Sequence, residues 1–422
     1  MTFRQIIAAI AVPAWALFLG LHVLHAPDTD QLESVLVPAS VDDTATLQAM
    51  CDRGGVVDLG GRMWVVHRII LHHRHNGLRL RNGIIYSPSD RDRPDKRFAL
   101  IEMCKGVTWR GTTYPDSPCN FIFENIEFVG PLVRYCDDFL TNHAAAREHA
   151  YCSAILAIDG SKIDSVTIRN CKARSMFGGF TLGYTVNAKV YDCEFDRIAA
   201  QCVSALTWDE TSQRAIDVYR CRAESCGSLF DFSGYAPGVA APKVPLAKVR
   251  QCTATNTLGR TKVHAQWDAL IDRCTFRLTR PIPQRYYGLS FPQARTVNIS
   301  NTLIEGYPAG GIQCTDWVEQ PFIDIRTTTI RGGQMGINST GFTHLDGVTF
   351  DGVLYPYGTP PASQSGVVIM NPATVDQVAN KFRGLQAMVV DWNRLHGTTY
   401  DPDRFWWISN EVRNRMQQME AN

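Results

Sequence analysis

Eight short segments of this chain share one frame and recur at the intervals of a solenoid. Each reads as an apolar residue, two variable residues and a small closing residue, as in Ile168-Arg169-Asn170-Cys171. The closing residues are Cys171, Cys193, Cys221, Cys252, Cys274, Thr302, Thr328 and Val348, separated by 20 to 31 residues. Repeats of this length stack, because a single one cannot bury its apolar face alone. The segment from Phe123 to Ile126 fits the same frame.

The composition of the repeats indicates strands rather than helices. β-Branched and alternating residues fill the segments, with Gly, Asn and Pro between them, and no helical 3.6-residue pattern intervenes. A coil of this length accommodates three short strands and their turns. The sequence therefore predicts an all-β fold, a single-stranded parallel β-helix.

Cysteine at one position of five successive coils predicts a stack inside the solenoid, with the coils ~4.8 Å apart. Cys is small and often buried, which suits a narrow interior. A metal site or a chain of disulfides is the alternative, but the C-x-x-C pairs typical of metal sites are absent. Cys119 and Cys136 flank an insertion and form the best candidate disulfide.

Composition excludes several classes of function. Forty-two Lys and Arg balance 41 Asp and Glu, and 45% of the 422 residues are apolar. This balance fits a globular protein with a large core and no nucleic-acid partner. No phosphate-binding loop or dinucleotide fingerprint occurs.

The N-terminal segment reads as a targeting sequence. Residues 6–25 contain no acidic residue and follow Arg4, so residues 1–26 are predicted to be a signal peptide or a membrane anchor. Residues 27–40 then form a linker. The rest is expected to be exported: periplasmic, secreted or anchored facing outward, with membrane contact only through residues 6–25 if they stay uncleaved.

A capped helix precedes the first coil. Asp42-Asp43-Thr44 reads as a helix start, and Gly54-Gly55 leads into a strand. The whole run, VDDTATLQAMCDRGGVVDLGGRMWVVHRIIL, resembles the N-terminal cap and first coil of the pectate-lyase-like superfamily of right-handed parallel β-helices. The resemblance extends through the repeats and implies a right-handed β-helix over residues 41–370.

The pattern changes after Pro372. Apolar residues from Val375 to Leu395 lie at helical spacing, and Asp401-Pro402 begins a second helical segment. Residues 371–422 are therefore predicted to be a C-terminal helical cap over the last coil.

The resemblance also implies a polysaccharide ligand in a groove along one outer sheet. Charged and aromatic residues collect in the segments that lie beyond the cysteine column, as a sugar-binding groove requires. The catalytic candidates are Asp231, Lys262, His264 and Arg285, and the substrate-binding candidates are Asp209, Glu210, Trp208, Tyr286, Tyr287 and Trp317. The alternative is the ordinary polar face of a solenoid.

Two mechanisms fit these residue types. Eliminative cleavage of a uronate needs a cation, here Arg285 or Lys262, and a base, here His264 or Tyr286. Hydrolysis needs two carboxylates, and Asp231 with Asp209 or Glu210 could supply them. Asp231 lies between Phe230 and Phe232, whose apolar rings should favour its protonated form.

We expect a lyase acting on an acidic extracellular or envelope polysaccharide. A glycoside hydrolase or a uronate epimerase is the alternative among enzymes, although the G-H-G and R-I-K motifs of polygalacturonases are missing. Outside enzymes, the alternative is a non-catalytic glycan-binding or assembly protein of polysaccharide export.

No cofactor is expected. A Ca²⁺ site finds no support, because the sequence has no dense carboxylate cluster. The four histidines at positions 67, 72, 73 and 75 lack carboxylate or Cys partners at ligand spacing, which favours a basic turn over a metal site.

Overall fold

The computed structural model describes most of residues 42–370. The described ranges are 42–87, 98–130, 152–158, 160–183, 185–206, 215–233, 246–259, 261–263, 267–281, 286–292, 294, 296–314, 322–339, 342–353, 355–358 and 368–370. Within them, no helix is long and apolar enough to cross a membrane. The predicted targeting segment, linker and C-terminal cap lie outside these ranges, so they stay predictions.

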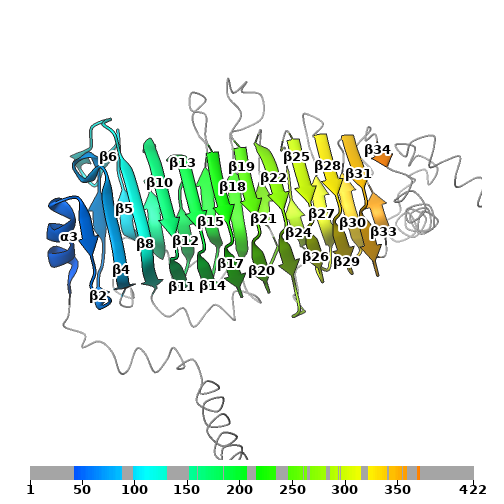
Figure 1. The fold of residues 1–422 in the computed structure, drawn as a ribbon, viewed down its shortest axis with the longest axis horizontal. Helices are drawn as coiled ribbons and strands as arrows, with labels where there is room; N and C mark the ends of the chain where they lie inside the picture. Colours follow the sequence, from blue (N-terminus) through cyan, green and yellow to red (C-terminus); the bar gives the residue numbers. More distant parts are fainter. Residues whose placement is uncertain are drawn as a thin grey trace, which may run out of the picture. The chain divides into compact units, whose positions relative to one another are not determined.

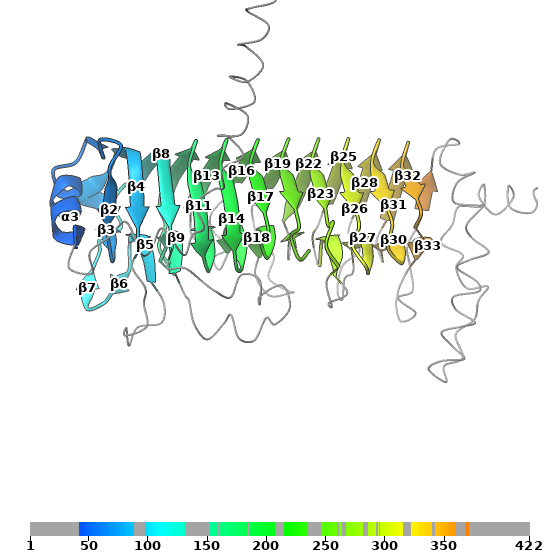
Figure 2. The ribbon, with the colours of Figure 1, turned by 90° about the horizontal axis from the view of Figure 1, so that it is seen from below.

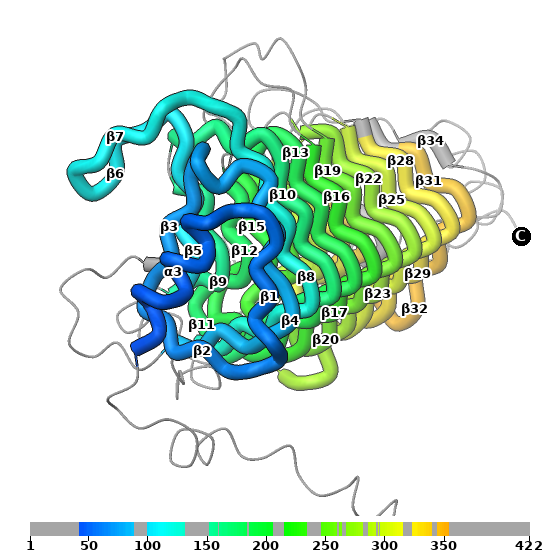
Figure 3. The backbone as a smooth tube through the Cα atoms, turned by 60° about the vertical axis from the view of Figure 1, so that its left-hand side comes forward, coloured from blue at the N-terminus to red at the C-terminus, as the bar shows by residue number. Residues whose placement is uncertain are grey.

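The described chain folds as a right-handed parallel β-helix, which confirms the predicted fold class. Successive coils stack along one axis from the N-terminal helix α3 (Thr44–Asp52) to the last strands (Figures 1 and 2). A complete coil contributes two strands to a 21-stranded sheet, here sheet A, and one to an 11-stranded sheet, here sheet B. Figure 3 shows the equivalent strands lying behind one another.

The strands of sheet A are β1 (Val56–Asp58), β2 (Met63–Val65), β4 (Leu78–Tyr86), β8 (Asn120–Val129), β10 (Ile163–Arg169), β11 (Lys172–Met176), β13 (Thr185–Tyr191), β14 (Glu194–Ile198), β16 (Ala215–Tyr219), β17 (Arg222–Glu224), β19 (Leu246–Arg250), β20 (Thr253–Thr255), β22 (Asp268–Asp272), β23 (Thr275–Arg277), β25 (Thr296–Ser300), β26 (Leu303–Glu305), β28 (Phe322–Arg326), β29 (Thr329–Arg331), β31 (Phe342–Asp346), β32 (Thr349–Asp351) and β34 (Val368–Met370).

The strands of sheet B are β3 (Ile69–Leu71), β5 (Phe98–Met103), β9 (Cys152–Ala157), β12 (Gly178–Thr181), β15 (Gln201–Leu206), β18 (Ser228–Ser233), β21 (Thr261–Val263), β24 (Tyr287–Ser290), β27 (Gly310–Cys314), β30 (Met335–Ser339) and β33 (Tyr355–Gly358). A separate antiparallel hairpin consists of β6 (Thr108–Trp109) and β7 (Thr112–Thr113).

The cysteine column lies inside the solenoid, as predicted. Its five thiols are at most 2% exposed, and Thr302, Thr328 and Val348 continue the column, equally buried. Every cysteine in the described ranges is a free, buried thiol, and this includes Cys119. Its proposed disulfide partner, Cys136, lies outside those ranges. The structure thus shows Cys119 as a thiol in the core.

The column carries its own hydrogen-bond pattern. Each sulfur lies near the carbonyl oxygen two residues before it, as Cys193 Sγ does at 3.2 Å from Tyr191 O. The hydroxyl of Thr302 donates to Ser300 O at 2.8 Å in the same way. Threonine therefore replaces cysteine in this column without leaving its hydroxyl unpaired.

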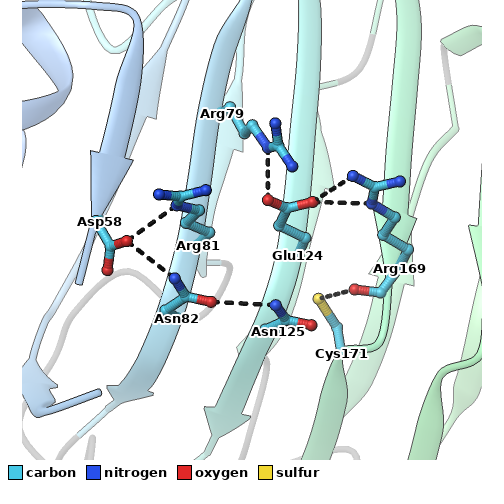
Figure 4. Close-up of polar contacts among 8 residues, drawn as sticks. All are labelled: Asp58, Arg79, Arg81, Asn82, Glu124, Asn125, Arg169 and Cys171. Carbon is cyan, nitrogen blue, oxygen red and sulfur yellow. Dashed lines mark hydrogen bonds and ion pairs between the residues drawn. The ribbon is translucent and has the colours of Figure 1, made fainter. Parts of the chain in front are cut away.

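A one-residue turn precedes the column in each repeat. The turn residue has positive φ, for example 52° at Asn170 and 47° at Thr327. Asparagine tolerates this conformation better than most residues. In the first coils the turn asparagines also bond to each other, because Asn125 Nδ2 donates to Asn82 Oδ1 at 3.1 Å (Figure 4).

Ion pairs cross the coils on the outer face of sheet A. Glu124 accepts from Arg79 on one side and from Arg169 on the other (Figure 4). Further along, Arg250 Nη2 contacts Asp217 Oδ2 at 2.8 Å. These pairs bind neighbouring coils together, as expected of a polar solenoid surface.

The histidine cluster connects the turn before the second coil with helix α3, through a contact between His75 and Asp52. His75 Nε2 and Asp52 Oδ1 lie 2.9 Å apart, and His75 Nδ1 accepts from the backbone N–H of His72 at 3.0 Å. Burial first, and then the neighbouring His75, lower the pKa of His72 to about 4. The contacts describe a structural junction at the 3₁₀ turn η1 (His73–His75).

Candidate functional site: the outer face of sheet B

One outward-facing column of sheet B is polar over seven consecutive coils. Its members occupy the same register position on strands β12 to β30 and are Thr181, Ser204, Asp231, Lys262, Ser290, Gln313 and Asn338. The residues on either side of the column position, such as Phe230 and Phe232, are buried in the core. Strand alternation therefore directs the column outward.

Asp231 and Lys262 are the charged members of this column. Lys262 Nζ lies 3.3 Å from Asp231 Oδ2. Gln201 Nε2 donates to the same oxygen at 3.2 Å, and Ser233 Oγ donates to Asp231 Oδ1 at 2.8 Å. Three donors thus converge on a carboxyl group whose residue is 8% exposed, while the Lys262 side chain is 30% exposed.

The predicted environment of Asp231 is wrong in one respect. Phe230 and Phe232 are fully buried, and their rings stack with centroids 5.0 Å apart on the interior side. Because Asp231 points the other way, the rings do not surround its carboxyl group. Lys262, Gln201 and Ser233 surround it instead, and an arrangement of three donors suits a carboxylate.

Ser290 is the residue opposite Lys262 on the next coil. The strand has a local irregularity just before it: a Cβ at Gly288 would lie 2.6 Å from Ile304 in the core, and the next residue, Leu289, is also buried. Two consecutive inward positions thus interrupt the alternation expected of a strand.

Several predicted site residues lie outside the described ranges. These are His264, Arg285, Asp209, Glu210, Trp208 and Trp317. Of the predicted residues that the structure does describe, it brings together Asp231 and Lys262. Tyr286 and Tyr287 lie at the start of β24, and Tyr286 packs against a small apolar cluster with Ala199 and Leu258.

Tyr287 lies further along the same face. Its Oη accepts a hydrogen bond from Asn338 Nδ2 at 3.1 Å, although Asn338 belongs to a strand two coils away. The intervening strand offers Gly310 at the register position of Tyr287. Burial raises the pKa of the Tyr287 hydroxyl, and the Asn338 hydrogen bond partly opposes this shift.

The first coils of sheet B differ from the rest. In the same column they carry Ile70, Glu102 and Leu156. Trp109 of the β6–β7 hairpin packs, as Ile70 and Leu156 do, against a buried cluster that includes Tyr114, and its Nε1 donates to Glu102 Oε2 at 2.9 Å. The hairpin therefore covers this face at the N-terminal end, and the polar column begins after it.

Sequence reasoning missed most of the uncharged members of this column. A signal for three of them exists in the words Gly288-Leu289-Ser290, Gly311-Ile312-Gln313 and Gly336-Ile337-Asn338, which share a glycine, an aliphatic residue and a polar residue. Aligning these words would have given the correct register. Among the residues that the structure describes, no group of three or more His, Cys, Asp or Glu is arranged to hold a metal ion.

Comparison with known proteins identifies the fold. No family model matches the sequence, and no curated protein matches it significantly. Among solved structures, the chain resembles the catalytic domain of a GH87 α-1,3-glucanase in complex with nigerose, at 10% identity and a TM-score of 0.50, covering 79% of this chain and 67% of that one. An aspartate-to-alanine variant of the glucanase gives a TM-score of 0.51 with the same identity and coverage.

A third structure, tailspike protein 3 of bacteriophage CBA120, has 10% identity and a TM-score of 0.43, covering 79% of this chain and 57% of that one. The glucanase likeness establishes a shared β-helix fold. At 10% identity it shows the fold alone.

Proposed function

We propose that this protein binds and cleaves a polysaccharide along the outer face of sheet B, with Asp231 and Lys262 at the centre of the site. The observation that carries the proposal is the polar column on seven successive coils. The coils are ~4.8 Å apart, so their side chains offer hydrogen-bonding groups at intervals close to the length of one sugar residue. The resemblance to a polysaccharide-cleaving glucanase supports the same ligand class.

We propose hydrolysis rather than elimination as the reaction. Elimination needs a cation whose charge is available to a uronate carboxylate, but Lys262 already pairs with Asp231 at 3.3 Å. Burial raises the pKa of the Tyr287 hydroxyl, so this group stays protonated near neutral pH and is not available as a base. Hydrolysis uses Asp231 directly, with Asp209 or Glu210 as the second carboxylate.

Elimination by Arg285 and His264 remains the competing reaction, and the products separate the two. The protein is incubated with a panel of neutral and acidic polysaccharides, and both reducing ends and unsaturated uronates are measured. Reducing ends without unsaturated products support hydrolysis, whereas unsaturated uronates support the lyase.

A second candidate function is glycan binding without catalysis. The mutual neutralisation of Asp231 and Lys262 favours it, because such a pair also serves as a fixed hydrogen-bonding group for sugar hydroxyls. Binding of a polysaccharide with no product of either kind would support this candidate. We further propose that the protein acts outside the cytoplasm, since residues 6–25 have the composition of a signal peptide or anchor.

A further inference from the structure

We infer that Tyr287 and Asn338 form a second subsite on sheet B, which binds a neutral pyranose two coils beyond the Asp231–Lys262 pair. The inference rests on the proposed function and specifies its substrate: the bound chain carries an uncharged sugar at this position.

The ring of Tyr287 lies over a position without a side chain. A Cβ built at Gly310 would come within 3.0 Å of Tyr287 Cε1, so the glycine leaves the space that the ring occupies. At φ +149° Gly310 also adopts a conformation that other residues rarely take. Because Gly310 belongs to the next coil, the ring extends across the strands instead of standing on its own strand.

Asn338 fixes the far end of the ring. Asn338 belongs to the coil beyond Gly310, and its Nδ2 donates a hydrogen bond of 3.1 Å to Tyr287 Oη. The phenol oxygen accepts this bond and keeps its own proton, for which no acceptor lies among the residues that the structure describes. A partly exposed aromatic ring with a fixed hydroxyl offers both a stacking surface and a donor to a sugar.

The residues that the structure describes beside the ring are uncharged. The polar column beside it consists of Ser290, Gln313 and Asn338, and Ser290 Oγ donates to Gln313 Oε1 at 3.3 Å. Met335 follows Gly310 at the register position of the ring. An acidic sugar would find no cation among these residues, whereas hydroxyl groups find amide and hydroxyl partners. The subsite therefore selects a neutral sugar.

The spacing connects this subsite with the charged pair. Lys262 lies on β21 and Gly310 on β27, two coils apart, which is about 10 Å at the usual strand spacing. A chain lying along the sheet would place roughly two sugar residues over this distance. One ligand then contacts both sites.

The test measures the affinity for a neutral gluco-tetrasaccharide and for a uronic-acid tetrasaccharide by calorimetry. The variants are Tyr287→Ala and, as a matched control, Tyr219→Ala, which removes a partly exposed tyrosine from the outer face of sheet A. We expect Tyr287→Ala to weaken binding of the neutral ligand about tenfold, a loss of ~1.4 kcal/mol that is typical of aromatic contacts. Tyr219→Ala should bind as the wild type does.

A third variant, Tyr287→Phe, keeps the ring and removes the hydroxyl, so it covers the case in which the alanine variant does not fold. We expect it to lose less affinity than Tyr287→Ala but more than the control. Equal affinity in wild type and both Tyr287 variants would overturn the subsite while leaving the proposed function intact. A wild-type protein that binds only the uronic ligand would overturn the neutral specificity, and one that binds no glycan at all would overturn both proposals.

Discussion

Asp231 and Lys262 face each other across adjacent coils, with the ammonium 3.3 Å from the carboxylate oxygen. Both lie in the column of sheet B that stays polar from β12 to β30. The ion pair on sheet A between Asp217 and Arg250 has similar chemistry but belongs to the opposite surface. The two pairs therefore provide a matched comparison between a proposed site and a purely structural contact.

The distribution of losses among variants identifies the reaction. Removing a catalytic acid or base lowers turnover by about 10²–10⁴-fold. If the protein is a hydrolase, Asp231→Asn and Asp209→Asn should lose the most activity. If it is a lyase, Arg285→Ala and His264→Ala should lose the most. Initial rates on the preferred polysaccharide decide between them, with melting temperatures confirming that each variant is folded. Full activity in all four variants would place the site elsewhere.

The thiols should be protected as long as the protein is folded. Every cysteine in the described ranges is buried, and burial, more than any neighbouring group, raises the pKa of Cys104 to about 12 and that of Cys119 to about 11. Thiolates are the reactive form, so we expect these cysteines to react with a maleimide only after denaturation. Mass spectrometry of peptides from the native and the unfolded protein provides the measurement. Rapid native labelling of Cys193 or Cys221 would contradict the interior column.

The threonines of the cysteine column indicate how the column would tolerate a serine in place of a cysteine. Cys193→Ser should destabilise the protein by less than about 1 kcal/mol, because a hydroxyl that donates to Tyr191 O regains a hydrogen bond. Thr302 and Thr328 already make the equivalent bond, at 2.8 and 2.9 Å. Cys193→Val, which cannot donate, is the paired variant. Chemical denaturation compares the two, and a serine variant less stable than the valine variant would show that the carbonyl is out of reach.

The predictable part of the fold was the part marked by a recurring four-residue word. The cysteine words keep their own length although 20 to 31 residues separate them, so Cys171 to Val348 could be aligned by inspection and the interior column follows from them. Sheet B could not be aligned in that way, because no single recurring residue marks its strands and Gly288 with Leu289 interrupts the alternation. Asp231 and Lys262 were found because they are charged. Gln201, Ser290 and Asn338 were missed, since a single polar residue in a strand is indistinguishable from surface until the register is known.

Thr327 occupies a turn that suits other residues better. Its φ is 47°, and the equivalent positions in the coils before and after hold Asn301 and Gly347. The left-handed conformation costs an ordinary L-residue about 1–2 kcal/mol, and Asn bears it more easily. We expect Thr327→Asn to raise the free energy of unfolding by roughly 0.5–1 kcal/mol. Thr329→Asn, two residues later in the regular strand β29, should not stabilise the protein. Equal effects of the two changes would exclude a conformational cause.

His72 should make the N-terminal junction sensitive to acid. Its pKa is lowered from 6.5 to about 4, chiefly by burial and by His75. The folded state therefore binds this proton less readily than the unfolded state, and stability falls as the pH drops from about 6.5 towards 4. We expect the melting temperature of His72→Asn to decline less steeply than that of the wild type across this window. An equal decline of the melting temperature with falling pH in the two proteins would show that His72 does not contribute to the acid sensitivity.

The most direct test of the account compares two carboxylates on opposite faces. The affinity and cleavage rate for the best polysaccharide of the panel are measured for the wild type, Asp231→Asn and the control Asp217→Asn, all with unchanged far-ultraviolet circular dichroism. We predict that Asp231→Asn loses cleavage or binding by at least about 10²-fold, while Asp217→Asn behaves as the wild type. Unaltered binding and cleavage in Asp231→Asn, or an equal loss in Asp217→Asn, would contradict the assignment of the site to sheet B.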